Sequence, residues 1–350
     1  MRTTEILTQT ISLSDIEKLS ENYKQVVFLN SNKDTSISYL ALGSKAEFKP
    51  EKNQVFDGLK SFVKENQDWV FGYLSYDLKN EVEPSLSSKN KDHLNFPEVH
   101  FFVPEIVVEL TVDFTKIHFT KNEQKDLFIS FLGEKSKKTT EKPSKVNFKQ
   151  RMSKENYEQR FEAIKEHIQQ GDIYEMNFCH EFYAENVEIN PFGTYTKLNE
   201  LTNAPFSVFY KNESQFVLCG SPERYIKKEA NKIISQPIKG TAKRLTSKIE
   251  DDKIASDLAK NIKERAENVM IVDLVRNDLS KSAKKGSVKV EELCKVYSFK
   301  QVHQMISTIV SEIEPNTHPV TVLKDTFPMG SMTGAPKVSA MRIIENIGIL

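Results

Sequence analysis

The first 120 residues alternate short apolar runs with polar turns, which is the pattern of β-strands. Three runs, at 25–29, 69–73 and 99–109, are rich in β-branched and aromatic residues and predict strands. The next residues, 121–150, contain many lysines around one short apolar island, which predicts a variable connection with a solvated face rather than a binding patch. The pattern divides the chain into a β-rich region (1–120), this lysine-rich connection and a larger region (151–350).

Apolar positions follow helical spacing beyond residue 151. A first amphipathic helix, which Gly171 is expected to end, is predicted from spacing at i, i+4, i+7 and i+11. The residues concerned are Tyr157, Phe161, Ile164 and Ile168. A second helix is predicted over 251–277, with one face carrying Leu258, Ile262, Ala266 and Met270. Strands and helices alternate irregularly, which favours an α+β or mixed layered fold over a regular βαβ array.

Composition narrows the possible function classes. Lysine plus arginine and aspartate plus glutamate both number 49, so no net charge attracts nucleic acid or an anionic membrane. No apolar run approaches the roughly 20 residues that span a bilayer, and the first ten residues lack a secretory-signal pattern. The 3 cysteines suggest neither a disulfide framework nor a zinc site, because Cys179-His180 has no second ligand cluster. A cytoplasmic globular protein is expected, with no nucleic-acid or membrane partner.

A predicted hairpin brings a carboxylate towards an amine. Its two strands lie near 223–228 and 233–238. Counting outward from the turn places Glu223 opposite Ile238 or Lys239, and directly opposed residues lie about 5 Å apart. The pair is either an ordinary ion pair or an acid/base carboxylate beside a lysine nucleophile. Because a nucleophilic lysine must be deprotonated, the second interpretation requires Glu223 to accept the lysine proton or to act as a protonated general acid.

A second carboxylate lies on the predicted 251–277 helix. Glu267 shares its face with apolar residues three, four and seven positions later, where a carboxylate is costly unless it meets a cation. Arg276 is nine residues away and better placed to pair with Asp273, so these charges and Asp278 are interpreted as structural. Glu267 therefore requires a partner from another element. That partner is either a lysine or arginine, or a metal such as Mg²⁺, which takes one or two carboxylates with water and substrate oxygens.

A glycine-rich turn leads into a predicted helix near residue 336. Gly330 and Gly334 bracket the turn, and Pro336 suits the first helical turn. An apolar stripe follows at Ala340, Ile343, Ile344 and Ile347. Such a turn exposes N–H groups to an anion, but no Ser or Thr follows Lys337, so it is not a P-loop. The turn is either structural or suited to a carboxylate rather than a triphosphate.

Together these segments resemble the chorismate-binding enzymes, which comprise anthranilate synthase component I, aminodeoxychorismate synthase component I, and the isochorismate and salicylate synthases. The motifs are GDIYEMNF (171–178), SPERY (221–225), QPIKGT (236–241), KERAENVMIVDLVRNDL (263–279) and FPMGSMTGAPK (327–337), with weaker matches at GYLSYD (72–77) and FLNS (28–31). The resemblance implies two intertwined α/β subdomains that form a large antiparallel β-sandwich flanked by helices, with Mg²⁺-dependent chemistry on chorismate.

Within this family, the residue between Pro-Ile and Gly-Thr separates subclasses. Aminodeoxychorismate synthases resemble this chain in having lysine there, at Lys239, where anthranilate synthases usually have alanine. The resemblance implies that Lys239 attacks C2 of chorismate as the C4 hydroxyl leaves with the help of Glu223. Ammonia then adds at C4 and expels the lysine, while Mg²⁺ held by Glu267 binds the ring carboxylate. The residues expected to contact substrate are Gly240, Thr241, Gly330, Ser331, Thr333 and Gly334.

The same resemblance implies a partner and a pathway. Ammonia would come from a separate glutamine amidotransferase subunit. The product, 4-amino-4-deoxychorismate, would be converted by a distinct lyase to 4-aminobenzoate for folate synthesis.

Several positions depart from family patterns. Isochorismate and salicylate synthases activate water with a lysine in the segment matching GDIYEMNF, and the aligned residue here is Glu175, so water attack at C2 by that route is not expected. Related amidating enzymes carry histidine immediately before Leu-Val-Ser, where this chain has Gln304. His303 lies one position earlier, and on a strand it would face the other way.

The family pattern also continues beyond residue 350, with a carboxylate-binding arginine, a glycine-rich segment and further magnesium-binding glutamates. The catalytic region is therefore expected to lack its C-terminal part, and a polypeptide ending at Leu350 is expected to have an incomplete magnesium site and little turnover. Two alternatives remain at this point. One is anthranilate synthase component I, and the other is a non-catalytic chorismate-binding remnant.

Overall fold

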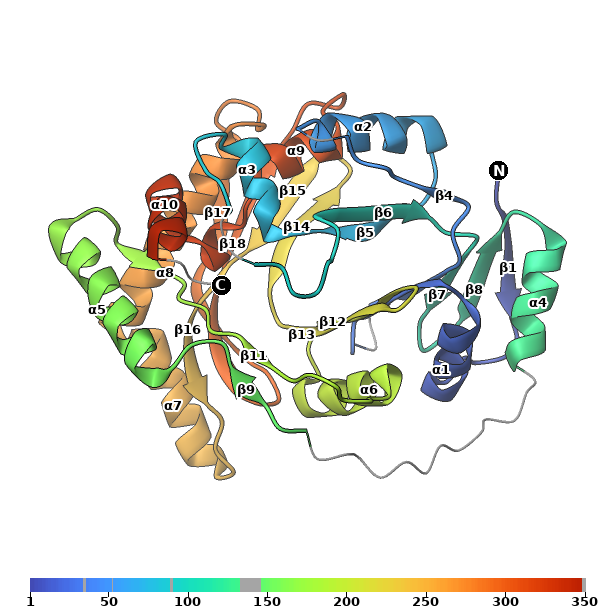
Figure 1. Cartoon of the computed structure of the whole chain (residues 1–350), viewed down its shortest axis with the longest axis horizontal. Coiled ribbons are helices and arrows are strands. Elements are labelled where there is room, and N and C mark those ends of the chain that lie inside the picture. Colours follow the sequence, from blue (N-terminus) through green and yellow to red (C-terminus); the bar gives the residue numbers. More distant parts are fainter. Residues whose placement is uncertain (34–35, 52, 89–90, 133–145, 348–350) are drawn as a thin grey trace.

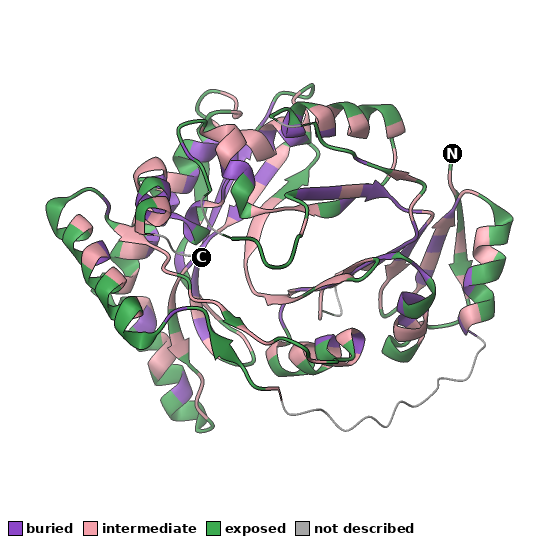
Figure 2. Cartoon of the chain, in the orientation of Figure 1, coloured by how far each residue is buried: buried purple, intermediate pink, exposed green. Residues whose placement is uncertain are grey.

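The computed structural model describes residues 1–33, 36–51, 53–88, 91–132 and 146–347. Two large sheets form the body of the protein, and helices cover their outer faces (Figure 1). Buried residues concentrate in the strands and on the inward faces of the helices (Figure 2). The expected α+β fold with antiparallel sheets flanked by helices is confirmed.

The first sheet has seven strands, each pair of neighbours antiparallel. Their order is β1 (Thr3–Leu7), β8 (Thr115–Phe119), β7 (Ile106–Leu110), β3 (Ser38–Leu42), β2 (Gln25–Asn30), β12 (Phe206–Asn212) and β13 (Gln215–Ser221). Strands from the N-terminal 120 residues thus pair directly with strands from beyond residue 200. The β-rich region (1–120) and the larger region (151–350) share one sheet, which is the intertwining that the resemblance implied.

Helices and a smaller sheet cover the two faces of this seven-stranded sheet. Buried side chains of α1 (Leu13–Asn22), α4 (Asn122–Leu132) and α6 (Pro191–Thr202) pack on one face. On the other face lies a three-stranded sheet of β4 (Ala46–Glu47), β6 (Val99–Val103) and β5 (Phe71–Leu74).

The second large sheet is organised around one long strand. β18 (Val302–Glu312) pairs along one edge with β15 (Lys232–Gln236) and then β16 (Ile238–Lys243), and along the other edge with β17 (Lys289–Ser298). β14 (Arg224–Glu229) completes the sheet beside β15. The helices α7 (Lys248–Lys260), α8 (Ile262–Ser280) and α9 (Pro319–Thr326) pack against this sheet or against one another.

The remaining elements connect the two sheets. They are α2 (Val55–Asn66), η1 (Tyr76–Leu78), α3 (Lys79–Val82), α5 (Lys154–Gln170), η2 (Gly330–Met332) and α10 (Lys337–Ile347), with the short pairs β9 (Lys149–Gln150)–β11 (Phe182–Tyr183) and β10 (Glu175–Met176)–β19 (Gly334–Ala335). The predicted apolar stripe of α10 is confirmed, because Ala340 and Ile343 pack against Ile164 of α5. α5 also ends as predicted, at Gly171 with φ 83°.

The structure differs from the sequence-based expectation in three elements. The apolar island of the lysine-rich connection forms α4, whose Phe128 is fully buried, while 133–145 lie outside the described residues. The run 99–109 is two strands, β6 and β7, which belong to different sheets.

None of the helices in the described part of the chain has the length and apolar character needed to cross a membrane.

The single helix predicted over 251–277 is wrong, because the chain breaks at Asn261. The Asn261 N–H caps the end of α7, and its side chain accepts a hydrogen bond from the Glu264 N–H at the start of α8. Asparagine is well suited to such a cap because its short side chain replaces a missing backbone partner. The break also changes the exposed face: Leu258 is buried, whereas Ile262 is 85% exposed.

Candidate active site

The predicted hairpin places Glu223 beside the strand that carries Lys239. β14 and β15 pair across a turn in which Ala230 has φ 50°. The Glu223 carboxylate accepts a hydrogen bond from the Ile238 N–H at 3.1 Å, so the carboxylate lies at the open end of the hairpin, as predicted. The Ser331 hydroxyl donates to the same carboxylate oxygen at 2.5 Å. Glu223 thereby links the hairpin to the glycine-rich turn.

Burial raises the pKa of Glu223 above its ordinary value. The hydrogen bonds from Ser331 and the Ile238 N–H, together with the positive charge of Lys239, offset part of this rise. A carboxyl group with a raised pKa stays protonated to higher pH, which is the property that a general acid needs.

Lys239 lies beside a bulge in β16. The register with β18 shifts between Ile238 and Thr241, where Gly240 has φ 94°. The buried Asn268 side chain of α8 donates to the Lys239 carbonyl at 3.1 Å and to the Met305 carbonyl at 3.2 Å, which fixes the bulge against the helix.

The amine of Lys239 forms an ion pair with Glu175, which lies outside the hairpin. Its Nζ lies 3.3 Å from Oε2 of Glu175, and the two side chains are 20% and 13% exposed. Burial raises the pKa of Glu175; the charge and hydrogen bond of Lys239 oppose that rise, and the charge of Glu267 adds to it. Lys239 is therefore close enough to Glu223 to affect its pKa, but its ion pair is with Glu175.

Three segments that are distant in sequence meet at this point. β10, which carries Glu175, pairs with β19 directly after the glycine-rich turn. The Asn177 side chain also donates to the Ser331 carbonyl at 2.5 Å, and the Asn177 N–H donates to the Thr333 carbonyl. The motifs GDIYEMNF, SPERY–QPIKGT and GSMTGAPK therefore form one site, with the AEN segment of α8 beside it.

The glycine-rich turn contributes its residues in different ways. Ser331 reaches Glu223, but Thr333 is fully buried and its hydroxyl donates to the Met329 carbonyl. Gly330 is buried against Leu274, whose side chain would lie 2.5 Å from an added Cβ. Thr333 and Gly330 thus support the shape of the turn, and Ser331 contacts the Glu223 carboxylate.

Gly334→Ala is expected to destabilise the fold by more than about 3 kcal/mol, because it adds a steric clash to an unfavourable backbone conformation. Gly334 has φ 142°, and an added Cβ would lie 2.4 Å from the Glu175 carbonyl oxygen. Thermal or urea unfolding measures the change. Gly171→Ala is the matched control, because Gly171 also has a positive φ but nothing lies within 4 Å of its added Cβ. If Gly334→Ala lowers the free energy of unfolding no more than Gly171→Ala does, the expected steric clash at Gly334 is wrong.

Lys337 is a structural residue beneath the turn. Its Nζ lies 2.6 Å from a carboxylate oxygen of Asp278 and donates to the carbonyls of Thr326 and Pro328. Burial lowers the pKa of Lys337, although Asp278 opposes this shift. The lysine that follows the glycines therefore points into the protein and holds α8 against α10.

Lys337→Met is expected to reduce the free energy of unfolding by about 3 to 5 kcal/mol, because it leaves Asp278 buried without its closest cation. The matched control is Lys281→Met, since Lys281 lies 3.0 Å from the other Asp278 oxygen but its side chain is 47% exposed. That control is expected to cost no more than about 1 kcal/mol. Equal losses in the two variants, measured by chemical unfolding, contradict the assignment.

Glu267 has a cation partner on its own helix, so it does not need a lysine or arginine from another element, and the predicted metal partner stays a prediction. Lys263 lies 3.5 Å from Glu267, at i,i+4 spacing, and the Glu267 side chain is 34% exposed. The predicted pairing of Arg276 with Asp273 is confirmed at 2.7 Å.

The carboxylates present fit a weakly coordinated Mg²⁺ but not a closed metal cage. No group of three or more His, Cys, Asp or Glu side chains among the described residues could hold a metal ion. Mg²⁺ needs only one or two carboxylates when water and substrate supply the other oxygens. The negative charge of Glu267 contributes to the raised pKa of Glu175, and Oε1 of Glu175 is buried without a hydrogen-bond partner in the described part of the chain. These two residues match the one or two carboxylate ligands that such a site needs.

His303 faces away from the site, as predicted. Its ring Nε2 donates to the Asp251 carboxylate at 3.0 Å, its Nδ1 forms a hydrogen bond with the Ser298 hydroxyl at 2.8 Å, and the side chain is buried. The hydrogen bonds from Arg244 and the Leu245 N–H hold the pKa of Asp251 well below its usual range. This network ties α7 to the sheet and is structural.

Gln304 occupies the opposite face of the strand, beside Thr241 in the register with β16. Its Oε1 is buried and has no hydrogen-bond partner among residues 1–33, 36–51, 53–88, 91–132 and 146–347.

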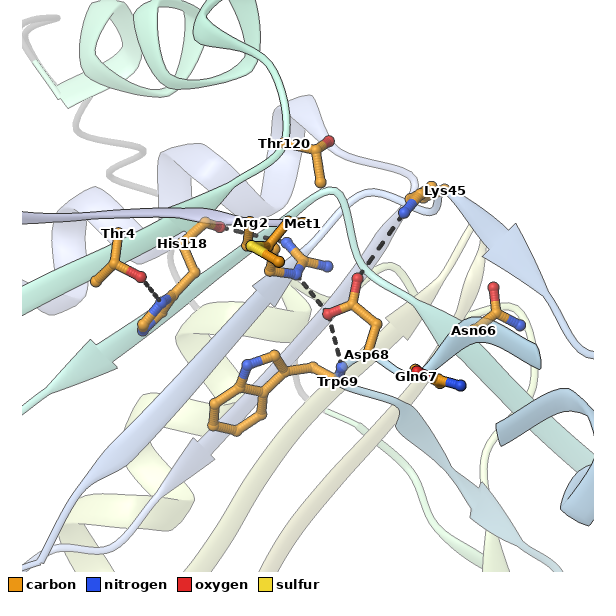
Figure 3. A pocket seen from close by; sticks show the side chains of 10 residues that line it. All are labelled: Met1, Arg2, Thr4, Lys45, Asn66, Gln67, Asp68, Trp69, His118 and Thr120. Carbon is orange, nitrogen blue, oxygen red and sulfur yellow. Dashed lines mark hydrogen bonds and ion pairs between the residues drawn. The ribbon is translucent and has the colours of Figure 1, made fainter. Parts of the chain in front are cut away.

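A cavity of about 640 Å³ lies elsewhere, near the N-terminus, and contains none of the predicted site residues (Figure 3). Figure 3 shows Asp68 between Arg2 and Lys45. Arg2 donates to Asp68 at 2.6 Å and to the carbonyls of Glu105 and His118. Burial alone would raise the pKa of Asp68, but the hydrogen bonds from Arg2 and the neighbouring backbone N–H lower it. The Arg2–Asp68 pair joins the start of β1 to the segment before β5.

Comparison with known proteins agrees with the arrangement of these motifs. Residues 24–348 match the family described as chorismate binding enzyme. Aminodeoxychorismate synthase component 1 of Escherichia coli is 41% identical over 196 residues, which cover 56% of this chain and 43% of that protein. Anthranilate synthase component 1 of Bacillus subtilis is 31% identical over 307 residues, which cover 79% of this chain and 59% of that protein.

A solved structure shows the same fold. Anthranilate synthase component I from Streptococcus pneumoniae superposes with a TM-score of 0.77 at 25% identity, covering 90% of this chain and 78% of that one. The chain spans about two fifths to three fifths of the length of the two curated relatives above. Since the family match extends over nearly the whole sequence and includes every segment that meets at Lys239, this chain belongs to the family of chorismate binding enzymes.

Proposed function

We propose that this protein is the aminating component of an aminodeoxychorismate synthase, which converts chorismate and ammonia to 4-amino-4-deoxychorismate. The observation that carries the proposal is Lys239, a partly buried amine flanked by two carboxylates with raised pKa values, Glu175 and Glu223. A lysine nucleophile and a protonated carboxyl group are the two groups that displacement of a ring hydroxyl requires.

The residues would act in two stages. The lone pair of Lys239 Nζ forms a bond to C2 of chorismate, the two ring double bonds shift, and the C4–O bond breaks. Glu223 gives its proton to the departing oxygen, which leaves as water. Ammonia then adds at C4, the double bonds shift back, and the C2–N bond breaks with its electron pair returning to Lys239. Glu223 regains a proton from solvent.

Mg²⁺ is part of this proposal as a cofactor. Glu267 and Glu175 would hold it, and when bound it would neutralise the ring carboxylate and withdraw electron density from the ring. Gly240 and Thr241 of the β16 bulge and Ser331 of the glycine-rich turn would line the substrate, while the buried Gly330, Thr333 and Gly334 would hold the shape of the turn.

A separate glutamine amidotransferase subunit is proposed to supply ammonia, and a lyase to convert the product to 4-aminobenzoate for folate synthesis. The name of the E. coli relative, component 1, supports the existence of a second component.

Product analysis tests the proposal. The enzyme expressed from its complete gene is incubated with chorismate, Mg²⁺ and ammonium, and the products are identified by mass spectrometry. Aminodeoxychorismate without pyruvate is the expected result. Anthranilate plus pyruvate would instead support the second candidate, anthranilate synthase component I, which is favoured by the 31% identity of the B. subtilis enzyme over 79% of this chain. Chorismate binding without any product contradicts both enzymatic candidates.

A further inference from the structure

A single buried side-chain amide joins the strand that carries Lys239 to two other strands of its sheet. Asn268 of α8 is 1% exposed. Its Nδ2 donates to the Lys239 carbonyl at 3.1 Å and to the Met305 carbonyl at 3.2 Å. Its Oδ1 accepts from the Ser307 hydroxyl at 2.5 Å and from the Cys294 thiol at 3.6 Å. Both hydrogens of the amide and both lone pairs of its oxygen are therefore used.

The amide lies between two irregularities of the sheet. The register of β16 with β18 shifts at Lys239 and Gly240, opposite Met305. The register of β17 with β18 shifts around Cys294, whose φ is 55°. Residues in a bulge lose their regular ladder partners, so their backbone groups need other partners. The Asn268 amide binds the Lys239 carbonyl, and the Ser307 hydroxyl accepts from the Cys294 N–H at 2.9 Å.

We infer, on the basis of the proposed covalent role of Lys239, that Asn268 is a positioning residue that aims the Lys239 amine at the substrate. The carbonyl that Asn268 holds belongs to the peptide unit that joins Lys239 to Gly240. Gly240 has φ 94°, and glycine lets such a unit rotate because it has no Cβ. The hydrogen bond from Asn268 opposes this rotation and fixes the direction in which the lysine side chain leaves the strand. That direction brings Nζ to 3.3 Å from Glu175.

The same turn of α8 relates the lysine to the proposed Mg²⁺ ligand. Asn268 directly follows Glu267, and successive residues of a helix point about 100° apart. The Glu267 side chain is 34% exposed, whereas Asn268 is buried against β16 and β18. In the proposed reaction the ring carboxylate lies at the metal while Lys239 attacks C2 of the same ring, so the two protein groups must keep a fixed separation. A misplacement of about 1 Å lowers the rate of such a step about 100-fold.

Asn268→Ala is expected to lower kcat about 30- to 100-fold and to change the dissociation constant of chorismate less than about threefold. The reason is that the lost hydrogen bonds orient the nucleophile and do not contact the substrate. Val272→Ala is the matched control, because Val272 lies one turn later on α8, is 3% exposed and packs in the core with Ile309. Its side chain cannot hydrogen-bond to either bulge. This control is expected to destabilise the fold but to keep kcat within about twofold of the parent value.

Amide hydrogen exchange measures the order of the bulge without chorismate. Peptides that cover 238–243 are expected to exchange about 5- to 50-fold faster in Asn268→Ala than in the parent protein. In Val272→Ala the same peptides are expected to stay within about twofold of the parent rate. A crystal structure of Asn268→Ala should also show that the Lys239 amine has moved out of contact with Glu175. Equal increases in exchange in the two variants would overturn the inference, because Asn268 would then contribute only to stability.

Ser307→Ala decides the question if Asn268→Ala does not fold. The Ser307 side chain is small and fully buried, and its loss leaves Asn268 in place without the hydroxyl that orients its amide. The expected effects have the same sign and are smaller, with kcat about 3- to 10-fold lower and exchange of 238–243 about 3- to 10-fold faster. A folded Ser307→Ala protein with the kcat and exchange of the parent would then overturn the inference.

Failure of the proposed function can be told apart from failure of the role of Asn268. A parent protein that forms no aminodeoxychorismate, but whose bulge exchanges selectively faster in Asn268→Ala, contradicts the proposed function and supports the placement of the strand by Asn268. Aminodeoxychorismate synthesis at the parent rate by folded Asn268→Ala contradicts the role of Asn268 and leaves the proposed function intact.

Discussion

Replacement of Lys239 by alanine is expected to reduce formation of aminodeoxychorismate by at least about 10³-fold, because removal of a covalent nucleophile leaves only binding and electrostatic effects. The substitution removes a side chain that is 20% exposed and whose amine contacts Glu175. The substrate dissociation constant is expected to change much less than kcat, since the lost bond forms only during the reaction. Mass spectrometry of the product and of the intact protein provides the measurement.

Lys243→Ala is a suitable control because Lys243 is an exposed lysine on the same strand, four residues further along. It is expected to keep the activity of the parent. In the parent protein, rapid quenching should also reveal a substrate adduct on the peptide that contains Lys239. An active Lys239→Ala enzyme that makes the same product would show that ammonia attacks the ring directly.

Glu223→Gln is expected to lower kcat by about 10² to 10⁴-fold, because glutamine keeps the shape of the side chain but cannot donate a proton to the leaving hydroxyl. The amide oxygen can still accept the hydrogen bond from the Ile238 N–H, so the hairpin is expected to keep its geometry. Unfolding measurements should therefore show little change while activity is lost. Loss of stability parallel to the loss of activity would indicate a structural role for Glu223.

The protonation of Glu223 also determines the direction in which the activity of the parent enzyme changes with pH. A general acid works in its protonated form, and burial raises the pKa of Glu223. Activity is therefore expected to fall as pH rises through that raised pKa, and the fall should be absent from the residual activity of Glu223→Gln. Ser331→Ala removes a hydrogen bond that lowers this pKa, so it should move the fall to higher pH. A fall at unchanged pH in Ser331→Ala is incompatible with Glu223 as the titrating group.

Local features of the candidate site could be predicted from the sequence because they depend on neighbours along the chain. The hairpin that places Glu223 beside Ile238 needs only a turn and two short strands, and Gly171 ends its helix for reasons of local backbone geometry. The cation partner of Glu267 is also local, since Lys263 lies one helical turn earlier. The apolar residues on the same face as Glu267 instead favoured the prediction of a cation from another element.

The contact between Lys239 and Glu175 could not be predicted in the same way. It depends on the pairing of β10 with β19, which joins Glu175 to Ala335 across 160 positions of sequence. No spacing rule connects such residues, although the expected alignment of Glu175 with a lysine of the isochorismate synthases indicated that this position belongs to the site. The break at Asn261 does not interrupt the four-residue repeat of apolar positions, so it can be recognised only from the preference of asparagine for helix caps.

The pairing of β2 with β12 affects how the polypeptide can be made in a cell. Residues of β2 such as Val27 pair with residues of β12 such as Tyr210. A ribosome adds about 5 to 20 residues per second, so this apolar strand waits roughly 10 to 35 s for its neighbour to be synthesised. During that interval one edge of a Val- and Phe-rich strand is open to other nascent chains, which is a condition that favours aggregation. Binding of molecular chaperones to the early chain should therefore improve the yield of folded protein.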